Sequence, residues 1–363
     1  MLPLLLLISC TSLNSSSWDR AYGLPHAREF HPAPVSARYS PLPAYSYQRD
    51  IKPLIEKHCT VCHGCYDAPC QLKLDSYQGL LRGANPTRVY DGTRLLGVAP
   101  TRMFEDATST QGWRNKGFFP VLNERGNSVD ANTRASVMVQ MLNLKQDNPL
   151  PTDPILPADF EFALDHDQYC PTIETFAAFR ERKPLWGMPY ALPGLRQDEQ
   201  ARLIAWLAQG APFGEVSVLN PALPPQIASW EKFFNGDSLK QQLSSRYMYE
   251  HLFLAQLYFE QAPDQYFRLV RSRTPPGKPI DRISSDRPYD DPGVARVYYR
   301  LWRDPSSVVV KTHMPYVLNQ ARMDKWRALF LDASYQVTQL PSYARETASN
   351  PFITFAELPI NAR

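Results

Sequence analysis

The chain has 363 residues, of which 44% are hydrophobic, so it is long enough for two domains with substantial cores. Its formal net charge is +3, with 39 basic and 36 acidic residues, which is too balanced to favour binding to nucleic acid. The 34 prolines indicate a loop-rich fold with short helices. The sequence contains no glycine-rich phosphate-binding motif, so no nucleotide cofactor is expected.

The N-terminus has the pattern of an export signal. Residues 2–8 are almost purely apolar and too few to span a bilayer, and a serine-rich stretch follows up to residue 17. The sequence Leu7-Ile8-Ser9-Cys10 resembles a lipoprotein cleavage box, which would leave Cys10 lipidated; the alternative is an ordinary cleavage site in the serine-rich stretch. We expect residues 1–17 to be a signal peptide and the mature chain to lie in the periplasm, with lipid anchoring to a membrane left open. Residues 18–44 are expected to form a proline-rich, extended arm.

A predicted helix leads directly into a cluster of cysteines. Its apolar stripe has the three- and four-residue spacing of a helix and consists of Tyr47, Ile51, Leu54, Ile55 and His58. Cys59 follows at the C-terminal end of this stripe. We therefore expect the first cysteine to be presented by the last turn of a helix.

Cys59, Cys62 and His63 form a C-x-x-C-H motif, which is typical of the attachment site of a c-type haem. The two thiols form thioethers with the haem vinyl groups, and the adjacent imidazole then lies under the ring, where it binds iron. The longer run C-x2-C-x2-C-x4-C adds Cys65 and Cys70, so a zinc, iron–sulfur or disulfide cluster is the alternative. We favour one covalent haem c because the export signal, the preceding helix and a downstream methionine agree with it.

Three cysteines remain after Cys10 and the haem motif, namely Cys65, Cys70 and Cys170. In an oxidising compartment, two of them are expected to pair. The sequence leaves open whether Cys65 pairs with Cys70 or Cys170 pairs with either of them.

A long insertion separates the haem motif from the next informative segment. Within it a helix is predicted over residues 133–144, where Val137, Met141 and Leu144 are in phase. An electron carrier needs only a haem and an exposed haem edge. The insertion therefore indicates additional walls around a substrate pocket, or else a structural embellishment.

Residues 187–212, GMPYALPGLRQDEQARLIAWLAQGAP, are typical of the segment that closes a class I cytochrome c domain. Met188 is our preferred sixth iron ligand, because it lies on a loop that the following proline stiffens. Other candidate ligands are Met103, Met138, Met141 and His166. A helix should follow, with acidic residues in its first turn and an end at Gly210. Its buried stripe is expected to be Ala201, Ile204, Ala205 and Ala208.

The second half of the chain has no haem motif. One helix is predicted within RYMYEHLFLAQLYFE, with an apolar face made by Tyr247, His251, Leu254 and Tyr258. Further along, Arg271 and Arg273 could hold a carboxylate or phosphate, or pair with Asp281 and Asp286. His251 and His313 are weaker candidates for a site.

Together these patterns predict a mainly α protein. A class I cytochrome-c-like haem domain with a long insertion would span residues 45–214, and a loop-rich α or α+β second domain would span residues 215–363.

Five blocks spread over residues 59–316 resemble the bacterial fatty acid cis/trans isomerase family: CTVCHGCYDAPCQLKL, RYMYEHLFLAQLYF, FRLVRSRTPPGKPI, RPYDDPGVARVYYR and KTHMPY. The resemblance implies a periplasmic haem enzyme that converts cis-unsaturated fatty acyl chains to trans. It carries over Cys59, Cys62 and His63 as the haem site and assigns no catalytic group beyond the haem iron. Family members are longer at the C-terminus, so this chain is expected to be a shortened or partial member.

This reaction suits a haem, because an electrophilic ferric iron can withdraw electron density from an alkene and let the carbon–carbon bond rotate without net oxidation. The expected partners are unsaturated fatty acids or phospholipid acyl chains, reached at a membrane surface. The alternative function is a periplasmic electron-transfer c-type cytochrome with an accessory domain. A zinc- or disulfide-stapled binding module is a further rival.

Overall fold

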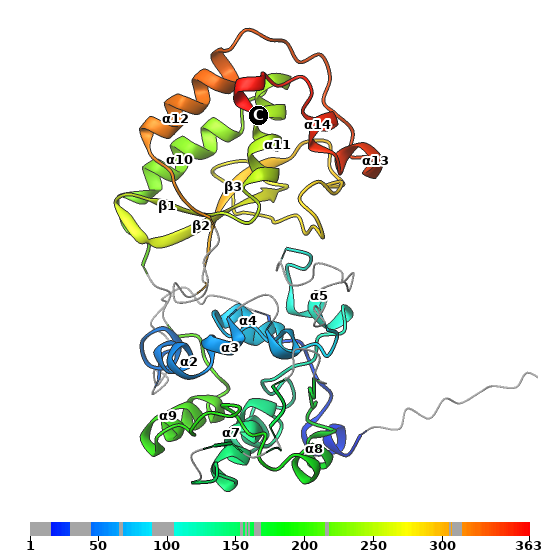
Figure 1. Cartoon of the computed structure of the whole chain (residues 1–363), viewed down its shortest axis with the longest axis vertical. Helices are drawn as coiled ribbons and strands as arrows, with labels where there is room; N and C mark the ends of the chain where they lie inside the picture. Colours follow the sequence, from blue (N-terminus) through cyan, green and yellow to red (C-terminus); the bar gives the residue numbers. More distant parts are fainter. Residues whose placement is uncertain are drawn as a thin grey trace, which may run out of the picture.

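The computed structural model describes residues 16–29, 45–64, 68–88, 105–152, 155–156, 158, 160–162, 168–214, 218–304, 306 and 314–363. These residues form two lobes (Figure 1). The first lobe, residues 16–214, is helical, and the second lobe, residues 218–363, combines helices with a sheet. Most of the predicted signal peptide and arm lie outside the described residues, as do Cys10, Cys65, Met103, His166 and His313.

The first lobe consists of short helices between loops: α1 (Ser17–Tyr22), η1 (Tyr47–Ile51), α2 (Lys52–His58), α3 (Thr60–His63), η2 (Pro69–Gln71), α4 (Tyr77–Arg82), α5 (Thr110–Asn115), α6 (Val129–Arg134), α7 (Val137–Asp147), α8 (Phe176–Arg182) and α9 (Gln197–Ala208). Several of them begin after a serine whose hydroxyl accepts a hydrogen bond from the backbone N–H three residues later, which satisfies an otherwise unpaired donor. These N-caps are Ser76, Ser109, Ser128 and Ser136.

The helix predicted before the cysteines is confirmed. It starts with one π-helical segment, η1, and continues as α2, with a proline in the first turn of α2. Its predicted stripe is largely buried: Tyr47, Ile51, Leu54 and Ile55 are at most 8% exposed. This face packs against α9 in one hydrophobic cluster. The C-x-x-C-H motif therefore follows a helix that is anchored in the core.

The other helices of the first lobe differ in detail from those that the sequence predicts. The segment 133–144 is divided, because α6 ends at Arg134 and α7 begins after the N-cap Ser136. Val137, Met141 and Leu144 are all buried on α7, as predicted.

The helix predicted after Met188 is α9, and the chain turns away from it at Gly210, whose φ is 86°. The predicted alanine stripe is wrong. Leu203, Trp206 and Leu207 are buried instead, whereas Ala201 is exposed. Larger apolar side chains gain more free energy from burial than alanine does, so they determine which face of the helix packs inward.

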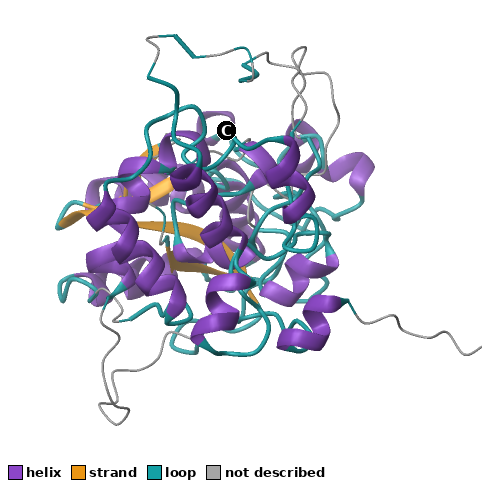
Figure 2. Ribbon diagram, turned by 90° about the horizontal axis from the view of Figure 1, so that it is seen from below, coloured by secondary structure: helices purple, strands orange, loops and turns teal. Residues whose placement is uncertain are grey.

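The second lobe is built from α10 (Leu223–Phe234), α11 (Leu239–His251), β1 (Gln256–Phe259), β2 (Ala262–Ser272), β3 (Tyr298–Arg303), β4 (Pro315–Val317), α12 (Gln320–Trp326), η4 (Arg327–Asp332), α13 (Arg345–Ala348), α14 (Pro351–Thr354) and η5 (Ile360–Ala362). The sheet has the order β3-β2-β1-β4, with β4 parallel to β1 and the other pairs antiparallel. Helices α10, α11 and α12 cover the side of the sheet that faces away from the first lobe (Figure 1). Figure 2 shows that the strands are confined to one part of the molecule, whereas helices and loops occur throughout.

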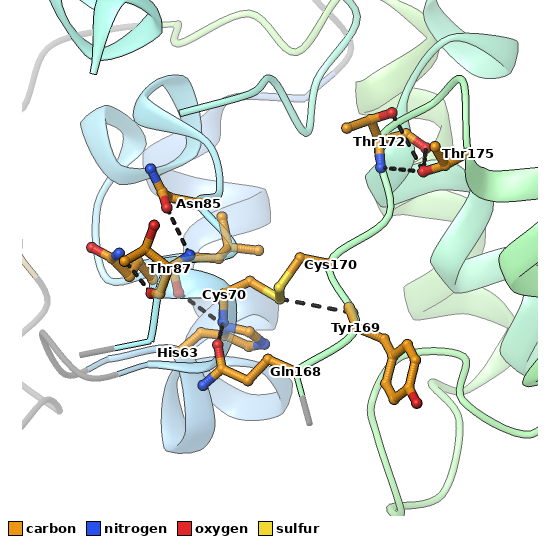
Figure 3. The surroundings of a disulfide bond; sticks show 11 residues. His63, Cys70, Asn85, Thr87, Gln168, Tyr169, Cys170, Thr172 and Thr175 are labelled. Atoms are coloured by element: carbon orange, nitrogen blue, oxygen red, sulfur yellow. Dashed lines mark hydrogen bonds between the residues drawn. A yellow bond between two sulfur atoms is a disulfide. The ribbon is translucent and has the colours of Figure 1, made fainter. Parts of the chain in front are cut away.

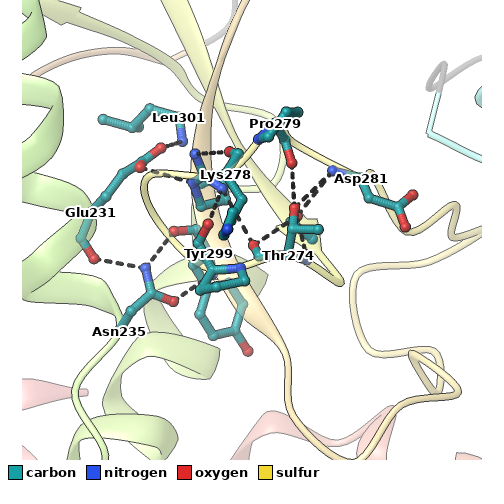
Figure 4. Close-up of polar contacts among 11 residues, drawn as sticks. Glu231, Asn235, Thr274, Lys278, Pro279, Asp281, Tyr299 and Leu301 are labelled. Carbon is teal, nitrogen blue, oxygen red and sulfur yellow. Dashed lines mark hydrogen bonds and ion pairs between the residues drawn. The ribbon is translucent and has the colours of Figure 1, made fainter.

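A buried polar network ties α10 to the sheet (Figure 4). The Glu231 carboxylate accepts hydrogen bonds from Arg300 Nε at 2.8 Å and from the backbone N–H of Leu301 at 2.9 Å. Asn235 accepts from the backbone N–H of Tyr299 at 2.8 Å and donates to the same residue's carbonyl at 2.7 Å. The last turn of α10 and its C-cap residue, Asn235, therefore bind consecutive residues of β3.

The prediction of a mainly α fold with a class I cytochrome-c-like domain is wrong. The second lobe is organised around a four-stranded mixed sheet, and the first lobe is an assembly of short helices between long loops. The stretch that was expected to be one helix ends at His251, and Tyr258 lies on β1. In β1, Leu257 and Phe259 are fully buried on either side of a half-exposed tyrosine, and this period of two is that of a strand.

The two lobes are joined by ion pairs that centre on Glu105. Its carboxylate binds Arg282 at 2.8 Å and Arg268 at 3.2 Å, and its backbone carbonyl accepts from Ser285 N–H at 2.6 Å. Lys116 adds a longer ion pair of 3.5 Å with Asp286.

Candidate functional site

The C-x-x-C-H motif is wound into helical turns at the end of α2. The backbone N–H of Cys59 donates to Ile55 C=O at 2.8 Å, and that of His63 donates to Cys59 C=O at 2.9 Å. Neither Cys59 nor Cys62 is in a disulfide. Burial raises the pKa of Cys59 to about 12, so its sulfur is a thiol at neutral pH. Cys59, Cys62 and His63 all line one cavity.

The imidazole of His63 is held in one orientation by the chain that follows it. Its Nδ1 lies 2.9 Å from the carbonyl oxygen of Leu72, which can only accept, so Nδ1 carries the proton and Nε2 keeps its lone pair. The backbone N–H of Leu74 in turn donates to His63 C=O at 2.7 Å. Burial lowers the pKa of His63 and favours the neutral ring. This is the arrangement by which proteins orient a histidine that binds a metal.

The cavity is almost wholly apolar. None of the described residues that line it is Lys, Arg, Asp or Glu. Helix α7 contributes Met138, Met141 and Leu142. The other apolar lining residues include Leu72, Leu74, Phe119, Val121, Trp186, Pro189 and Leu192. Such walls suit a flat apolar ring or an acyl chain and exclude water from both.

Met188 lines the same cavity. Its backbone N–H donates to Met141 C=O at 3.1 Å, which fastens its loop to α7. The preceding Gly187 lies against α7 so closely that a Cβ atom there would be 2.2 Å from the backbone nitrogen of Lys145. Met138 and Met141, which the sequence offered as other thioether candidates, also line the cavity. The four residues predicted to hold the cofactor are therefore brought together.

A disulfide joins Cys70 to Cys170 (Figure 3), and both residues line the cavity. The two residues are 100 positions apart, and their Cα atoms are 5.7 Å apart. The backbone N–H of Cys70 also donates to Gln168 Oε1 at 3.1 Å. This is one of the pairings that the sequence left open, and it joins the segment after the haem motif to the insertion.

An aromatic group at the cavity was not anticipated. The ring of Trp186 makes edge contacts with Tyr190 at 5.1 Å and with Tyr169 at 5.3 Å between centroids. All three rings line the cavity. The only signal in the sequence was the density of aromatic residues around Met188, which does not by itself indicate a shared wall.

The polar candidates of the second lobe do not line this cavity. Arg271 is buried and donates to Asp290 C=O at 2.6 Å, and Arg273 pairs with Asp281 at 3.2 Å. The Nδ1 atom of His251 lies 2.8 Å from the Tyr247 carbonyl oxygen at the end of α11. These side chains are engaged within their own lobe.

A family model described as fatty acid cis/trans isomerase matches residues 98–363, well over half of the chain. Comparison with curated proteins and with solved structures gave no match. In the described part of the chain, no helix has the length and apolar character needed to cross a membrane. The match covers the cavity residues from Phe119 onward and the entire second lobe. This chain therefore belongs to the fatty acid cis/trans isomerase family and is an isomerase.

Proposed function

We propose that this chain is a haem-dependent isomerase that converts cis-unsaturated fatty acyl chains to trans. One haem c would be attached through Cys59 and Cys62, and His63 would bind its iron. The observation that carries the proposal is the meeting of these residues with Met188 around one apolar cavity, in a chain of the fatty acid isomerase family.

The residues present fit this cofactor in three respects. The two motif sulfurs are not consumed by a disulfide. The hydrogen bond from His63 Nδ1 to the Leu72 carbonyl leaves Nε2 as the free ring nitrogen on the cavity wall. The alternative of a four-cysteine zinc or iron–sulfur cluster is less well supported, because Cys70 is bonded to Cys170.

A haem held by Cys59, Cys62 and His63 would supply an electrophilic centre, the chemistry needed to weaken the double-bond character of an alkene without net oxidation. The protein's own contribution is positioning. The Leu72 carbonyl keeps the His63 ring in place, and the walls made by α7 and the Trp186–Leu192 segment hold an apolar chain away from water. No proton or hydride needs to leave the site, which agrees with the lack of charged side chains in the described cavity lining.

Met188 is our candidate for the sixth iron ligand. Its loop is fastened to α7 through the backbone hydrogen bond to Met141, while its side chain is only partly buried. Met188 would hold the iron through its thioether, which is a weaker ligand than an imidazole. Met188 would then control access to the iron.

We further propose that the enzyme works in the periplasm, at a membrane surface from which acyl chains enter the cavity. The support for this is the export signal in residues 1–17 and the apolar character of the cavity. The assay below presents the substrate both as a free fatty acid and as a phospholipid acyl chain.

The test is a lipid assay on purified, haem-loaded protein. The protein is incubated with a cis-monounsaturated fatty acid or with vesicles of the corresponding phosphatidylcholine, and the products are separated by gas chromatography. We expect trans product that is absent when both Cys59 and Cys62 are changed to alanine. Red, folded protein that forms no trans product from either substrate would contradict the proposal and leave the electron-transfer function as the alternative.

A further inference from the structure

Lys145 is a buried lysine whose charge has no partner in the part of the chain that the structure describes. It is 3% exposed, and its Nζ atom has no hydrogen-bond or ion-pair partner among the described residues. It lies on α7 three and four residues after Leu142 and Met141, so it continues the face of the helix that lines the apolar cavity. Lys145 therefore follows, along α7, the residues of that helix that line the apolar cavity.

The backbone at Lys145 packs closely against the loop that carries Met188. A Cβ at Gly187 would meet its backbone nitrogen at 2.2 Å, and one at Gly194 would meet its Cγ at 3.5 Å. Both glycines belong to the loop that carries Met188 past the apolar cavity. Lys145 is thus enclosed by the same loop that we assign to the iron site.

A second, polar cavity opens at Lys145. It lies at the N-terminus of α9, a helix of 12 residues whose dipole favours negative charge at this end. Besides Lys145, it is lined by Gln146, Pro149, Gly194, Leu195, Gln197 and Gln200. Gln200 donates to Gln146 Oε1 at 2.7 Å, so the amides are already ordered. Ammonium and amide groups together suit an oxyanion.

The carboxylates of the neighbouring helices are bound elsewhere. Glu199 is held by Lys57 at 2.8 Å and by His58 at 3.1 Å. Asp198 pairs with Arg196 at 3.3 Å, and Asp147 pairs with Arg180 at 3.0 Å. None of these acids compensates Lys145. A buried, unpaired ammonium is unfavourable, and its desolvation lowers the pKa of Lys145.

We propose that Lys145, with the amide-lined cavity at the start of α9, binds the carboxylate of a molecule whose apolar part occupies the neighbouring apolar cavity. This inference rests on the proposed function, which supplies two such carboxylates: that of a fatty acid substrate and a propionate of the haem. The ion pair would be largely withdrawn from water and therefore strong. For a fatty acid, it would fix how far the chain enters and hence which double bond reaches the iron.

The experiment compares three variants of the haem-loaded chain of 363 residues. Lys145→Met removes the charge but keeps the aliphatic stem, and Lys145→Arg keeps the charge. Lys232→Met is the matched control, because Lys232 is an exposed lysine on α10. Binding of oleate and of methyl oleate is measured by equilibrium titration, without turnover, so that an inactive protein still reports on the site.

If the ligand is the fatty acid, Lys145→Met should bind oleate at least about tenfold more weakly than wild type, with methyl oleate unchanged. Lys145→Arg and Lys232→Met should retain oleate binding. If the ligand is a haem propionate, oleate binding should be unchanged, and Lys145→Met should instead shift the haem midpoint potential measured without lipid, while Lys232→Met should not. Either pattern supports the site.

The proposal is overturned if Lys145→Met leaves both the oleate affinity and the midpoint potential at wild-type values. Loss of the unpaired charge should not unfold the protein, and thermal unfolding of the lipid-free variant checks this. Should Lys145→Met fail to fold, Lys145→Gln is the second uncharged variant. Wild-type protein that binds oleate and methyl oleate equally, and whose midpoint potential is the same in Lys145→Gln, also overturns the proposal.

Discussion

His63 and Leu72 are joined by a hydrogen bond of 2.9 Å from the imidazole Nδ1 to the backbone carbonyl oxygen. Since the carbonyl belongs to the main chain, the orientation of the ring does not depend on the identity of a second side chain. The same segment returns a hydrogen bond of 2.7 Å from Leu74 N–H to His63 C=O. The histidine is therefore fixed at both its ring and its backbone, on the wall of the apolar cavity.

Changing His63 to alanine should abolish isomerisation while leaving the haem attached, because the thioether bonds do not involve the imidazole. We expect a shifted haem absorption band and a loss of activity of about a hundredfold or more, from spectra and gas chromatography. Added imidazole should restore part of both. His251→Ala is the control, since its ring lies at the end of α11 and should leave the spectrum unchanged. An unaltered spectrum in His63→Ala would show that His63 does not bind iron.

Gly187→Ala should displace the loop that carries Met188. The new Cβ would lie 2.2 Å and 2.6 Å from backbone atoms of Lys145, which cannot move without distorting α7. We expect the free energy of unfolding to fall by about 2–4 kcal/mol in urea titrations. Gly194→Ala is the matched control in the same loop, because its nearest contact would be an ordinary 3.5 Å, and it should cost no more than about 0.5 kcal/mol. Equal losses would contradict this account of Gly187.

Glu231→Ala should be far more destabilising than removal of an exposed ion pair. It would leave Arg300 and the Leu301 N–H without their carboxylate in a buried site, at a cost of about 3–5 kcal/mol. Arg273→Ala breaks the pair with Asp281, where both side chains are about half exposed, and should change stability by less than about 1 kcal/mol. Urea unfolding of both variants gives the comparison, and similar values would show that α10 is not held to β3 by this network.

The stability of the protein should depend on pH through Asp106. Burial raises the pKa of this carboxyl from its ordinary 3.8 to about 6, although Lys116 at 3.4 Å opposes the rise. The folded state therefore holds the proton more tightly than the unfolded state, and Asp106 destabilises the protein increasingly as the pH rises through the window from about 4 to 6.

Asp106→Asn should remove this dependence. Relative to wild type, the variant should gain stability between pH 5 and pH 8, by about 1 kcal/mol or more in urea unfolding. Asp286→Asn is the control, because its half-exposed carboxyl also faces Lys116, and loss of this surface ion pair should change stability by less than about 1 kcal/mol. If the difference in stability between Asp106→Asn and wild type is the same at pH 5 and at pH 8, burial does not disfavour the ionised form of Asp106.

The parts of this protein that could be predicted from the sequence are those with local signals. The C-x-x-C-H spacing, the apolar stripe from Tyr47 to His58, and the Met188 loop with its following helix depend on residues close together in the chain. These local signals predict Cys59, Cys62, His63 and Met188 as the residues that hold the cofactor, and all four line one cavity. Their role in binding haem stays a prediction.

The remainder depends on contacts between distant segments. Strand β1 pairs in parallel with β4, which follows more than fifty residues later. Nothing local marks a short run such as Leu257 to Phe259 as a strand, so the sequence predicts it as part of the preceding helix. Trp186 and Tyr169 carry no period that indicates a shared cavity wall. The buried face of α9 differs from the predicted stripe of Ala201, Ile204, Ala205 and Ala208, because burying Trp206 gains more free energy than burying alanine.

The bond between Cys70 and Cys170 has a consequence for how the protein matures. Cys70 lies eight residues after Cys62, close enough along the chain to compete for either thiol of the motif. Its native partner is 100 residues further on, and pairing with it leaves Cys59 and Cys62 as thiols. In an oxidising compartment, the order in which the cysteines are oxidised therefore decides whether Cys59 and Cys62 remain available as thiols. A chain interrupted before residue 170 would lack the partner that protects it.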